Sequence, residues 1–235
     1  MTVIRIDIRQ KRYAGKDKAH TALSDLKFQV GENEFVSVLG PSGCGKTTML
    51  NLSAGLDTDY AGEISMNPGA LDHLAYVFQS PRLLPWRTAE QNVELALDDA
   101  VPSAAITSDL LAAVGMADFA RHYPGELSLG MQRRVSLARA FACRPQLMLM
   151  DEPFVSLDPQ AAGELRALLK SILAERPATV IFVTHDHREA VQLGDRVIVL
   201  SGSPAHVVKD VQVELSQRQR GDPAAIEKFV EGHLR

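Results

Sequence analysis

Hydrophobic and polar residues alternate in two early segments of the chain, whereas later segments contain short, uninterrupted apolar runs. Residues 4–9 and 26–30 alternate with a period of two, which is the pattern of a half-buried strand. Residues 35–39 form a continuous apolar run before Gly40, as expected for a buried parallel strand. Similar runs occupy residues 74–78, 147–150, 179–183 and 197–200. The pattern therefore predicts buried parallel strands and an early antiparallel pair.

Helical patterns lie between these runs, for example at residues 129–142 and 161–175. Strands that alternate with helices predict an α/β fold with a mostly parallel sheet covered on both faces. Residues 81–142 contain no strand pattern, so we expect an inserted helical subdomain there, with residues 1–80 and 143–235 as the core. A short amphipathic stretch at residues 224–230 is expected to pack on the surface.

Composition narrows the class of protein. The 235 residues and 25.6 kDa suit one α/β domain with a small insertion. Asp and Glu number 29 against 25 Lys and Arg, so the net charge of −4 argues against a uniformly basic nucleic-acid or membrane-surface binder. Cys44 and Cys143 form neither a zinc motif nor a disulfide framework, which fits a reducing cytoplasm. With neither a membrane-spanning run nor a signal peptide in the sequence, we expect a soluble cytoplasmic chain.

Residues 40–48 carry the pattern GxxxxGK followed by threonine, directly after a predicted strand and before a helical segment. Glycines let backbone N–H groups turn toward phosphate oxygens, and the start of the helix adds positive partial charge. In such a loop Lys46 reaches the β and γ phosphates of ATP, and the Thr47 hydroxyl coordinates Mg²⁺. The predicted ATP-binding residues are Gly40, Pro41, Ser42, Gly43, Cys44, Gly45, Lys46, Thr47 and Thr48. For Cys44 we expect the backbone N–H, not the thiol, to matter.

A second motif ends the apolar run at residues 147–150 with Asp151 and Glu152. Asp151 is positioned to hold Mg²⁺ through its water shell, and Glu152 to polarise the attacking water as general base. A strand that ends in two solvated acids is common, so this motif gains its weight from the phosphate loop. Together the two motifs predict a nucleoside triphosphatase or a kinase.

The segment Leu127-Ser128-Leu129-Gly130-Met131-Gln132-Arg133-Arg134 separates these candidates. It begins 20 residues before the strand that carries Asp151, and it resembles the signature motif (LSGGQ and basic residues) of ATP-binding-cassette (ABC) ATPases. Four further motifs of that family match in position, namely Tyr13, Gln79, Ser156-Leu157-Asp158 and His185. The likeness covers residues 1 to about 200 with the motifs in the family's order.

The resemblance implies a head-to-tail dimer that holds two ATP molecules between phosphate loops and partner signatures. The signature residues that would contact the partner's ATP are Ser128, Leu129, Gly130 and Met131. It also implies Gln79 as a ligand of Mg²⁺ and water, Asp158 in the D-loop, and Tyr13 stacked on adenine. His185 would sense the γ-phosphate and act in catalysis with Lys46 and Glu152.

Structural roles are the alternatives for several of these residues. A lone glutamine such as Gln79 is usually a surface amide, a lone histidine such as His185 usually satisfies a core hydrogen bond, and Tyr13 is alternatively a turn aromatic. Ser128 precedes a helical pattern and is well placed as its N-cap. We interpret the arginines of that helix as a solvated or ion-paired face and not as a nucleic-acid patch; they are Arg133, Arg134 and Arg139.

Leu129 departs from the family pattern, which has glycine at this position. An isobutyl group there would crowd the partner's nucleotide or demand backbone angles that leucine disfavours. We therefore hypothesise a weakened signature, and a closed dimer that is less stable or asymmetric. Met131 in place of the family's glutamine is a smaller departure.

A single cassette of this length resembles the separate ATPase subunit of a bacterial transporter. Gln79-Ser80-Pro81-Arg82-Leu83-Leu84-Pro85-Trp86, with Asn92-Val93 beyond it, resembles the importer branch for nitrate, taurine and aliphatic sulfonates. In this family the segment docks a helix of the permease, and Leu83, Leu84 and Trp86 would suit such a contact. Alternatively, Trp86 is a core anchor.

The resemblance therefore implies an ATP-hydrolysing importer subunit, a translocase that uses ATP and Mg²⁺. Its partners would be a second copy of the chain, transmembrane permease subunits and, indirectly, a periplasmic solute-binding protein, at the inner face of the cell membrane. One alternative is a soluble cassette ATPase of an assembly or repair machine, and another is a regulatory cassette in a heterodimer. A kinase is disfavoured because it has no use for the signature, Asp158 and His185 together.

Overall fold

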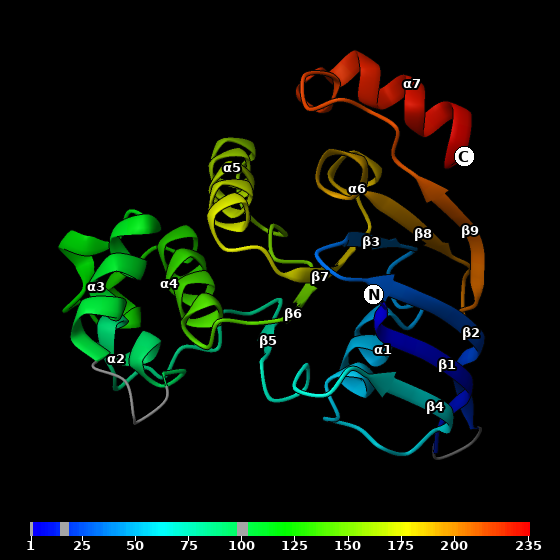
Figure 1. Ribbon diagram of the computed structural model, residues 1–235, viewed down its shortest axis with the longest axis horizontal. Coiled ribbons are helices and arrows are strands. Elements are labelled where there is room, and N and C mark those ends of the chain that lie inside the picture. The colour runs from blue at the N-terminus through cyan, green and yellow to red at the C-terminus, as the bar shows by residue number, and fades with distance from the viewer. Residues whose placement is uncertain (1, 15–18, 98–102) are drawn as a thin grey trace. The chain divides into compact units, whose positions relative to one another are not determined.

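The computed structural model describes residues 2–14, 19–97 and 103–235, and the chain forms two compact units (Figure 1). Unit 1 consists of Met1–Leu71 and Thr179–Arg235, and unit 2 consists of Asp72–Ala178. The predicted limits of the helical subdomain, about residues 81–142, remain a prediction.

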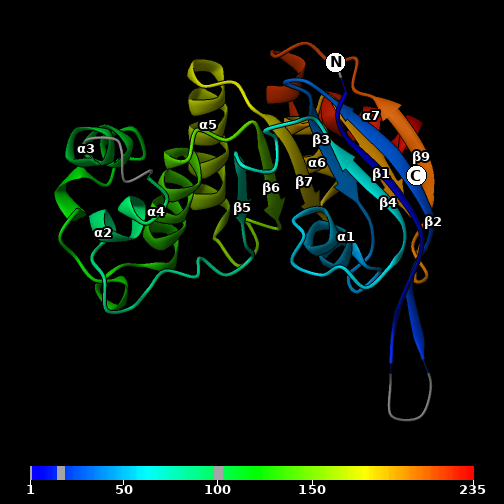
Figure 2. The same cartoon turned by 60° about the horizontal axis from the view of Figure 1, so that its bottom comes forward.

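An antiparallel sheet in unit 1 contains β1 (Thr2–Tyr13), β2 (His20–Gly31) and β4 (Ala61–Met66), with β1 in the centre. The β1–β2 hairpin extends as a long two-stranded ribbon (Figure 2). Alternate residues of β1, including Ile4, Ile6 and Ile8, are buried, so the predicted antiparallel pair is confirmed. The sequence did not predict β4 because its residues are largely exposed.

A second set of strands in unit 1 is mostly parallel. β3 (Phe35–Leu39) lies between β7 (Thr179–Thr184) and β8 (Arg196–Leu200), and both neighbours run parallel to it. β9 (Val207–Gln212) pairs antiparallel with β8. Every residue of β3 and β7 is buried, which explains their uninterrupted apolar sequences. Three of the predicted buried strands are thereby confirmed.

The helices of unit 1 are α1 (Lys46–Ser53), α6 (His187–Leu193), α7 (Pro223–His233) and the short 3-10 turn η3 (Gln219–Gly221). α7 packs on α6 through an apolar cluster that includes Val191, Ile226 and Phe229 (Figure 1). The predicted amphipathic stretch at residues 224–230 therefore does pack on the protein, as part of a longer helix.

Unit 2 contains two parallel strands, β5 (Leu74–Val77) and β6 (Leu147–Asp151), together with its helices. These helices are α2 (Ala89–Glu94), α3 (Ser103–Ala113), α4 (Leu129–Ala142), α5 (Pro159–Glu175), η1 (Ala117–Phe119) and η2 (Pro124–Glu126). α4 contacts both α2 and α3. Residues 81–142 contain no strand where the structure describes them, and α4 has the predicted bounds.

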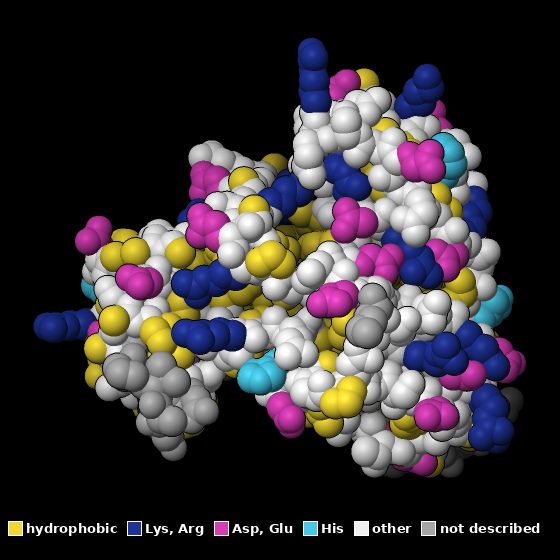
Figure 3. Space-filling view, in the orientation of Figure 1, with side chains coloured by type: hydrophobic (Ala, Val, Ile, Leu, Met, Phe, Trp, Pro, Cys, Tyr) yellow, Lys and Arg dark blue, Asp and Glu magenta, His cyan; other side chains and the backbone are white. Residues whose placement is uncertain are grey.

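The elements agree with the predicted α/β class, with parallel strands, an antiparallel sheet and a helical segment. Within the described ranges, no helix combines the length and apolar character that crossing a bilayer requires. Acidic and basic side chains are interspersed over the face of the molecule shown in Figure 3.

Candidate nucleotide site

The phosphate loop connects β3 to α1 in unit 1. Two of its glycines have left-handed backbone angles, with φ of 76° at Gly43 and 120° at Gly45. A Cβ on Gly45 would lie 2.7 Å from Leu23 Cδ2 and 3.1 Å from the Ala22 carbonyl oxygen, so the turn excludes any side chain there. The Cys44 thiol is buried, and its backbone N–H donates to the Pro41 carbonyl at 3.3 Å.

The start of α1 lacks the side-chain cap that five other α-helices have. Five α-helices begin with a side-chain oxygen that accepts a backbone N–H, from Thr88, Ser128, Asp158, Asp186 and Asp222. At α1 the N-cap is Gly45, no side chain caps the helix, and its first turn has no acidic residue. Among the α-helices whose N-caps the structure describes, α1 is therefore the one that leaves this position to an external anion.

Lys46 is the first residue of α1, and its side chain folds back into the phosphate loop. Its side chain is only 4% exposed, and Nζ donates to the carbonyl oxygens of Gly40 at 2.8 Å and Pro41 at 3.0 Å. The ammonium is thus held among the backbone groups that would surround a phosphate. Thr47, in the first turn of α1, is exposed to solvent, so a hydrated cation can reach its hydroxyl.

Tyr13 ends β1 and is 41% exposed. Its hydroxyl donates to Thr48 Oγ1 at 3.3 Å, which joins the ring to the first turns of α1. The Lys11 Nζ lies over the ring, 4.7 Å from its centroid. The structure therefore brings Tyr13 beside the phosphate loop, as the adenine prediction requires.

Lys11 is a buried lysine with two acidic partners, an arrangement that sequence reasoning missed. Nζ lies 2.9 Å from Asp57 Oδ2 and 3.4 Å from Asp59 Oδ2, and the Lys11 side chain is 2% exposed. Burial by itself would lower the pKa of Lys11, but hydrogen bonds to Asp57 and Asp59 outweigh burial and raise it. The hydrogen bond from Lys11 lowers the pKa of Asp57. The alternation that buries Ile4, Ile6 and Ile8 would place Lys11 on the opposite face, and the register of β1 shifts beyond Ile8, so the sequence pattern gave no signal for this burial.

His185 follows the last residue of β7 and is exposed. The residues on both sides of it are fixed, because the backbone N–H of Asp186 donates to Thr184 Oγ1 at 3.0 Å. The Asp186 carboxylate in turn caps α6 by accepting the Arg188 N–H at 2.7 Å. His185 therefore extends from a rigid turn at the carboxyl end of β7. His187 is also exposed.

In unit 2, Asp151 is the last residue of β6 and is 5% exposed, and Glu152 follows it. Burial raises the pKa of Tyr76, and the negative charge of Asp151 raises it further. Carboxylate, hydroxyl and amide oxygens of the predicted kind are the ligands that Mg²⁺ prefers. Where the chain is described, no three His, Cys, Asp or Glu side chains form a metal cluster. Each predicted donor, by its chemistry, is of a kind that suits an Mg²⁺ ion that also keeps waters and phosphate ligands.

Other predicted residues of unit 2 lie at the ends of its elements. Gln79 is exposed, two residues beyond the end of β5. Ser128 caps α4 by accepting the Met131 N–H at 3.3 Å, which confirms the predicted cap. Asp158 caps α5 by accepting the Ala161 N–H at 3.0 Å, so it has a structural role whatever else it does.

Leu129 is the first residue of α4 and is 40% exposed. It lies in an ordinary helical conformation and does not have a positive φ. The expectation that leucine would be held at disfavoured backbone angles here is therefore wrong. Crowding of a partner's nucleotide stays a prediction. A side chain would fit at Gly130 more easily than at Gly45, since a Cβ at Gly130 would lie 3.9 Å from Leu157 Cδ2, which is an ordinary contact distance.

The three arginines of α4 do not share one environment. Arg134 forms the expected ion pair, with Glu164 at 2.8 Å. The solvated-face interpretation is wrong for Arg133, which is 7% exposed and donates to the carbonyl oxygens of Pro153 and Val155. Arg139 donates to the carbonyls of Pro81 and Arg82 at 2.8 and 2.9 Å, and burial lowers its pKa. One helical position decides between a surface ion pair and a buried donor.

Trp86 is 70% exposed, so the alternative that it anchors the core is wrong. Its loop is nevertheless held firmly by Asn92, which is fully buried. Asn92 Oδ1 accepts the Leu84 N–H at 2.8 Å, and its Nδ2 donates to the carbonyls of Arg87 at 3.0 Å and Thr88 at 2.9 Å. Because Asn92 binds the loop on both sides of the indole, the large apolar side chain is presented on a fixed turn.

Comparisons with known proteins agree with these features. Residues 23–155 match the family described as ABC transporter. The aliphatic sulfonates import ATP-binding protein SsuB 2 of Pseudomonas syringae pv. tomato is 39% identical over 94% of this chain and 91% of its own length. SsuB of Bacillus licheniformis is 38% identical over 94% of this chain and 89% of its own. The dimeric post-hydrolysis structure of the ATP-binding cassette MJ0796, bound to ADP and Pi, has a TM-score of 0.77 at 31% identity and covers 91% of this chain and 100% of that one.

The phosphate loop and the acidic end of β6 already define the class, that of the P-loop nucleoside triphosphatases. Within that class the chain belongs to the ABC transporter family. It is an ATP-binding ATPase cassette, and the resemblance seen in the sequence is confirmed.

Asp57→Asn is expected to lower the free energy of unfolding at pH 7 by about 1–3 kcal/mol, because it removes a negative charge that offsets the cost of burying the Lys11 ammonium. The folded-state pKa of Asp57 lies below its unfolded value, so its stabilisation is present above about pH 4 and is lost as pH falls through the folded pKa. The difference between the two proteins should therefore shrink at low pH. Urea unfolding at pH 7 and pH 3 measures it.

The control is Asp7→Asn, whose ion pair with Lys27 joins side chains that are 41% and 56% exposed. We expect that change to cost less than about 1 kcal/mol. An equal loss in both variants would contradict the importance of burial at Lys11.

Proposed function

We propose that the chain is the ATP-hydrolysing subunit of a bacterial importer for a small organic sulfonate or a similar anion. The observation that carries the ATPase role is the uncapped start of α1 behind a glycine loop that contains the Lys46 ammonium. Support for import comes from relatives that are named aliphatic sulfonates import ATP-binding proteins, aligned over more than nine tenths of this chain.

ATP would bind with its phosphates on the loop at residues 40–48 and its adenine on Tyr13. Mg²⁺ would be held by Thr47 and Gln79, and by Asp151 through water. It supplies charge neutralisation of the phosphates when bound. The α4 helix of a second copy, capped by Ser128, would present its N-terminal N–H groups to the γ-phosphate and close a head-to-tail dimer.

Hydrolysis would use the chain's own charged groups at the γ-phosphate. Glu152 accepts a proton from the attacking water as general base, and Lys46 and His185 stabilise the negative charge of the transferred group. Loss of the γ-phosphate removes the anion that attracts the partner helix. The dimer then opens, and this alternation drives the permease between its access states.

The Trp86 loop would be the contact with the permease. The indole is exposed on a turn that Asn92 fixes on both sides, and a rigid aromatic anchor costs little conformational entropy on binding. The adjoining residues Leu83 and Leu84 are partly buried and extend the apolar surface. A complex of this kind would lie at the inner face of the cell membrane, with a periplasmic binding protein on the far side.

A tagged copy of the chain, solubilised from membranes in mild detergent, is expected to copurify with one kind of permease and with no other ATPase. That composition corresponds to a homodimeric importer, and mass spectrometry of the purified complex identifies it. A second, different cassette would instead favour the regulatory heterodimer suggested by Leu129. If no membrane protein copurifies with the chain, the importer proposal is overturned and a soluble assembly or repair ATPase is favoured.

Glu152→Gln is expected to lower kcat for ATP hydrolysis by about 100-fold or more, because the amide cannot accept the proton of the attacking water. Nucleotide binding should stay within about 3-fold of the parent, since the phosphate loop is unchanged. Phosphate release and fluorescent-nucleotide titration measure the two quantities. The control is Glu175→Gln, an exposed position at the end of α5. Undiminished turnover by Glu152→Gln would contradict the assignment of the base.

Trp86→Asp is expected to reduce uptake of a labelled alkanesulfonate by at least about 10-fold, because a carboxylate replaces the aromatic anchor. ATP binding by the isolated subunit should not change, since the indole is 70% exposed and supports no core packing. Val208→Asp is the matched control on β9, where the side chain is 54% exposed. Normal uptake by Trp86→Asp in reconstituted vesicles would refute the docking role.

A further inference from the structure

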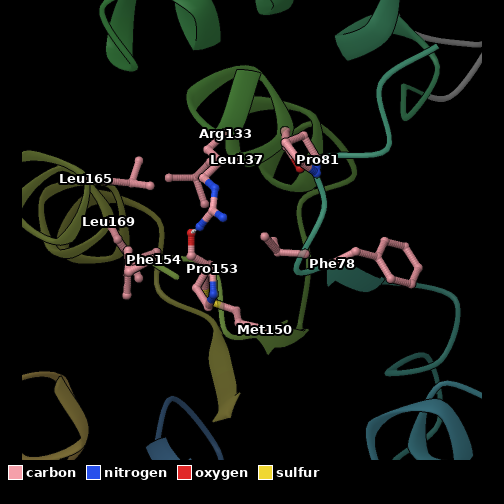
Figure 4. A pocket seen from close by; sticks show the side chains of 11 residues that line it. Phe78, Pro81, Arg133, Leu137, Met150, Pro153, Phe154, Leu165 and Leu169 are labelled. Carbon is pink, nitrogen blue, oxygen red and sulfur yellow. Dashed lines mark hydrogen bonds between the residues drawn. The ribbon is translucent and has the colours of Figure 1, made fainter. Parts of the chain in front are cut away.

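Arg133 is a buried cation that extends from α4 to the turn following β6. Its side chain is 7% exposed, although the residues before and after it on the helix are more accessible. One terminal nitrogen donates to the Pro153 carbonyl and the other donates to the Val155 carbonyl. Figure 4 shows the guanidinium directed at Pro153 inside a pocket. A planar guanidinium carries its donors in a fixed fork, which suits two carbonyls that lie two residues apart.

The turn held by Arg133 has unusual backbone angles at both ends. Glu152 has φ of 43° and Ser156 has φ of 63°, and both values lie in the left-handed region that residues with a β-carbon disfavour. The backbone bonds of the turn are Val155 N–H to the Glu152 carbonyl at 3.2 Å and Leu157 N–H to the Phe154 carbonyl at 3.3 Å. Such a conformation persists only where the surroundings over-determine it, and Arg133 binds two carbonyls inside the strained span.

The surroundings make these hydrogen bonds hard to replace. Leu137 of α4, Leu165 and Leu169 of α5, and Met150 of β6 line the pocket around the guanidinium (Figure 4). Phe154 lies against the same apolar wall and is 4% exposed. The hydrogen bond to the Pro153 carbonyl is buried and the one to the Val155 carbonyl is partly buried, so removal of the Arg133 donors leaves at least the Pro153 carbonyl poorly satisfied. The turn would then relax toward commoner backbone angles, and Glu152 would move with it.

We propose that Arg133 is the positioning residue for Glu152. The inference rests on the proposed function, in which the Glu152 carboxylate activates water. Arg133 does not touch the reacting atoms. Through the Pro153 carbonyl it fixes the Pro153–Phe154 peptide, one residue beyond Glu152, and thereby restrains the backbone from which the Glu152 carboxylate extends. Because the same helix begins at the Ser128 cap, Arg133 also joins the start of the signature helix to the catalytic turn.

Arg133→Met is expected to lower kcat for ATP hydrolysis by at least about 10-fold, with KM and the nucleotide dissociation constant within about 2-fold of the parent. Arg133→Lys should recover part of the loss, because an ammonium can donate to one of the two carbonyls. The matched control is Arg134→Met, one position along the helix, whose partners are Glu164 and the Val114 carbonyl. That variant should retain the parent's kcat.

A double-mutant cycle with Glu152→Gln distinguishes positioning from general structural damage. If Arg133 acts through the carboxylate, Arg133→Met should lower the residual rate by less than about 2-fold in the Glu152→Gln background. An undiminished 10-fold effect in that background, or a parallel loss of nucleotide binding, would overturn the inference. Should Arg133→Met fail to fold in thermal unfolding, Arg133→Lys takes its place in the cycle.

The cycle also separates failure of the inference from failure of the proposed function. Normal turnover by Glu152→Gln alone would refute the role of Glu152 in the proposed function and, with it, the role of Arg133. Loss of turnover in Glu152→Gln together with normal kcat in Arg133→Met and Arg133→Lys would overturn the role of Arg133 only.

Discussion

The first backbone N–H groups of each helix must find acceptors, and this constraint organises the candidate site. At five α-helices a Thr, Ser or Asp of the chain supplies the acceptor, and three of these residues, Ser128, Asp158 and Asp186, belong to or adjoin motifs of the ATPase family. α1 has Gly45 at that position, and the loop before it holds a lysine among its carbonyls. Binding of phosphate therefore completes a cap that the fold leaves open.

Three cations, of which Lys11 and Arg133 are buried and Arg139 is partly buried, hold segments that adjoin predicted site residues. Lys11 ties the strand that carries Tyr13 to Asp57 and Asp59, Arg133 holds the turn after β6, and Arg139 holds the segment after β5. Each side chain donates to at least two acceptors, and the bond from Arg133 to the Pro153 carbonyl is fully buried. These contacts touch no predicted ATP atom, yet they fix the turns from which Tyr13 and Glu152 extend.

Burial decided how much of the fold could be predicted. The continuous apolar runs of β3, β6 and β7 identified buried strands, because every residue of these strands faces packed neighbours. β4 and β9 were missed, since half or more of their residues are exposed and their sequences lack an apolar run. α6 was missed because seven residues are too few to show a helical period.

The sequence by itself determined the phosphate loop, the acidic pair and the order of the motifs, since each depends on residue types at fixed short spacings. Only the tertiary structure decided the environments of Arg133, Arg134 and Trp86. Adjacent arginines on α4 point in directions about 100° apart, so one enters the apolar pocket and the other meets Glu164 at the surface. Trp86 is exposed on a loop that Asn92 holds through hydrogen bonds to Leu84 and Arg87, and hydrophobicity along the chain does not encode these contacts.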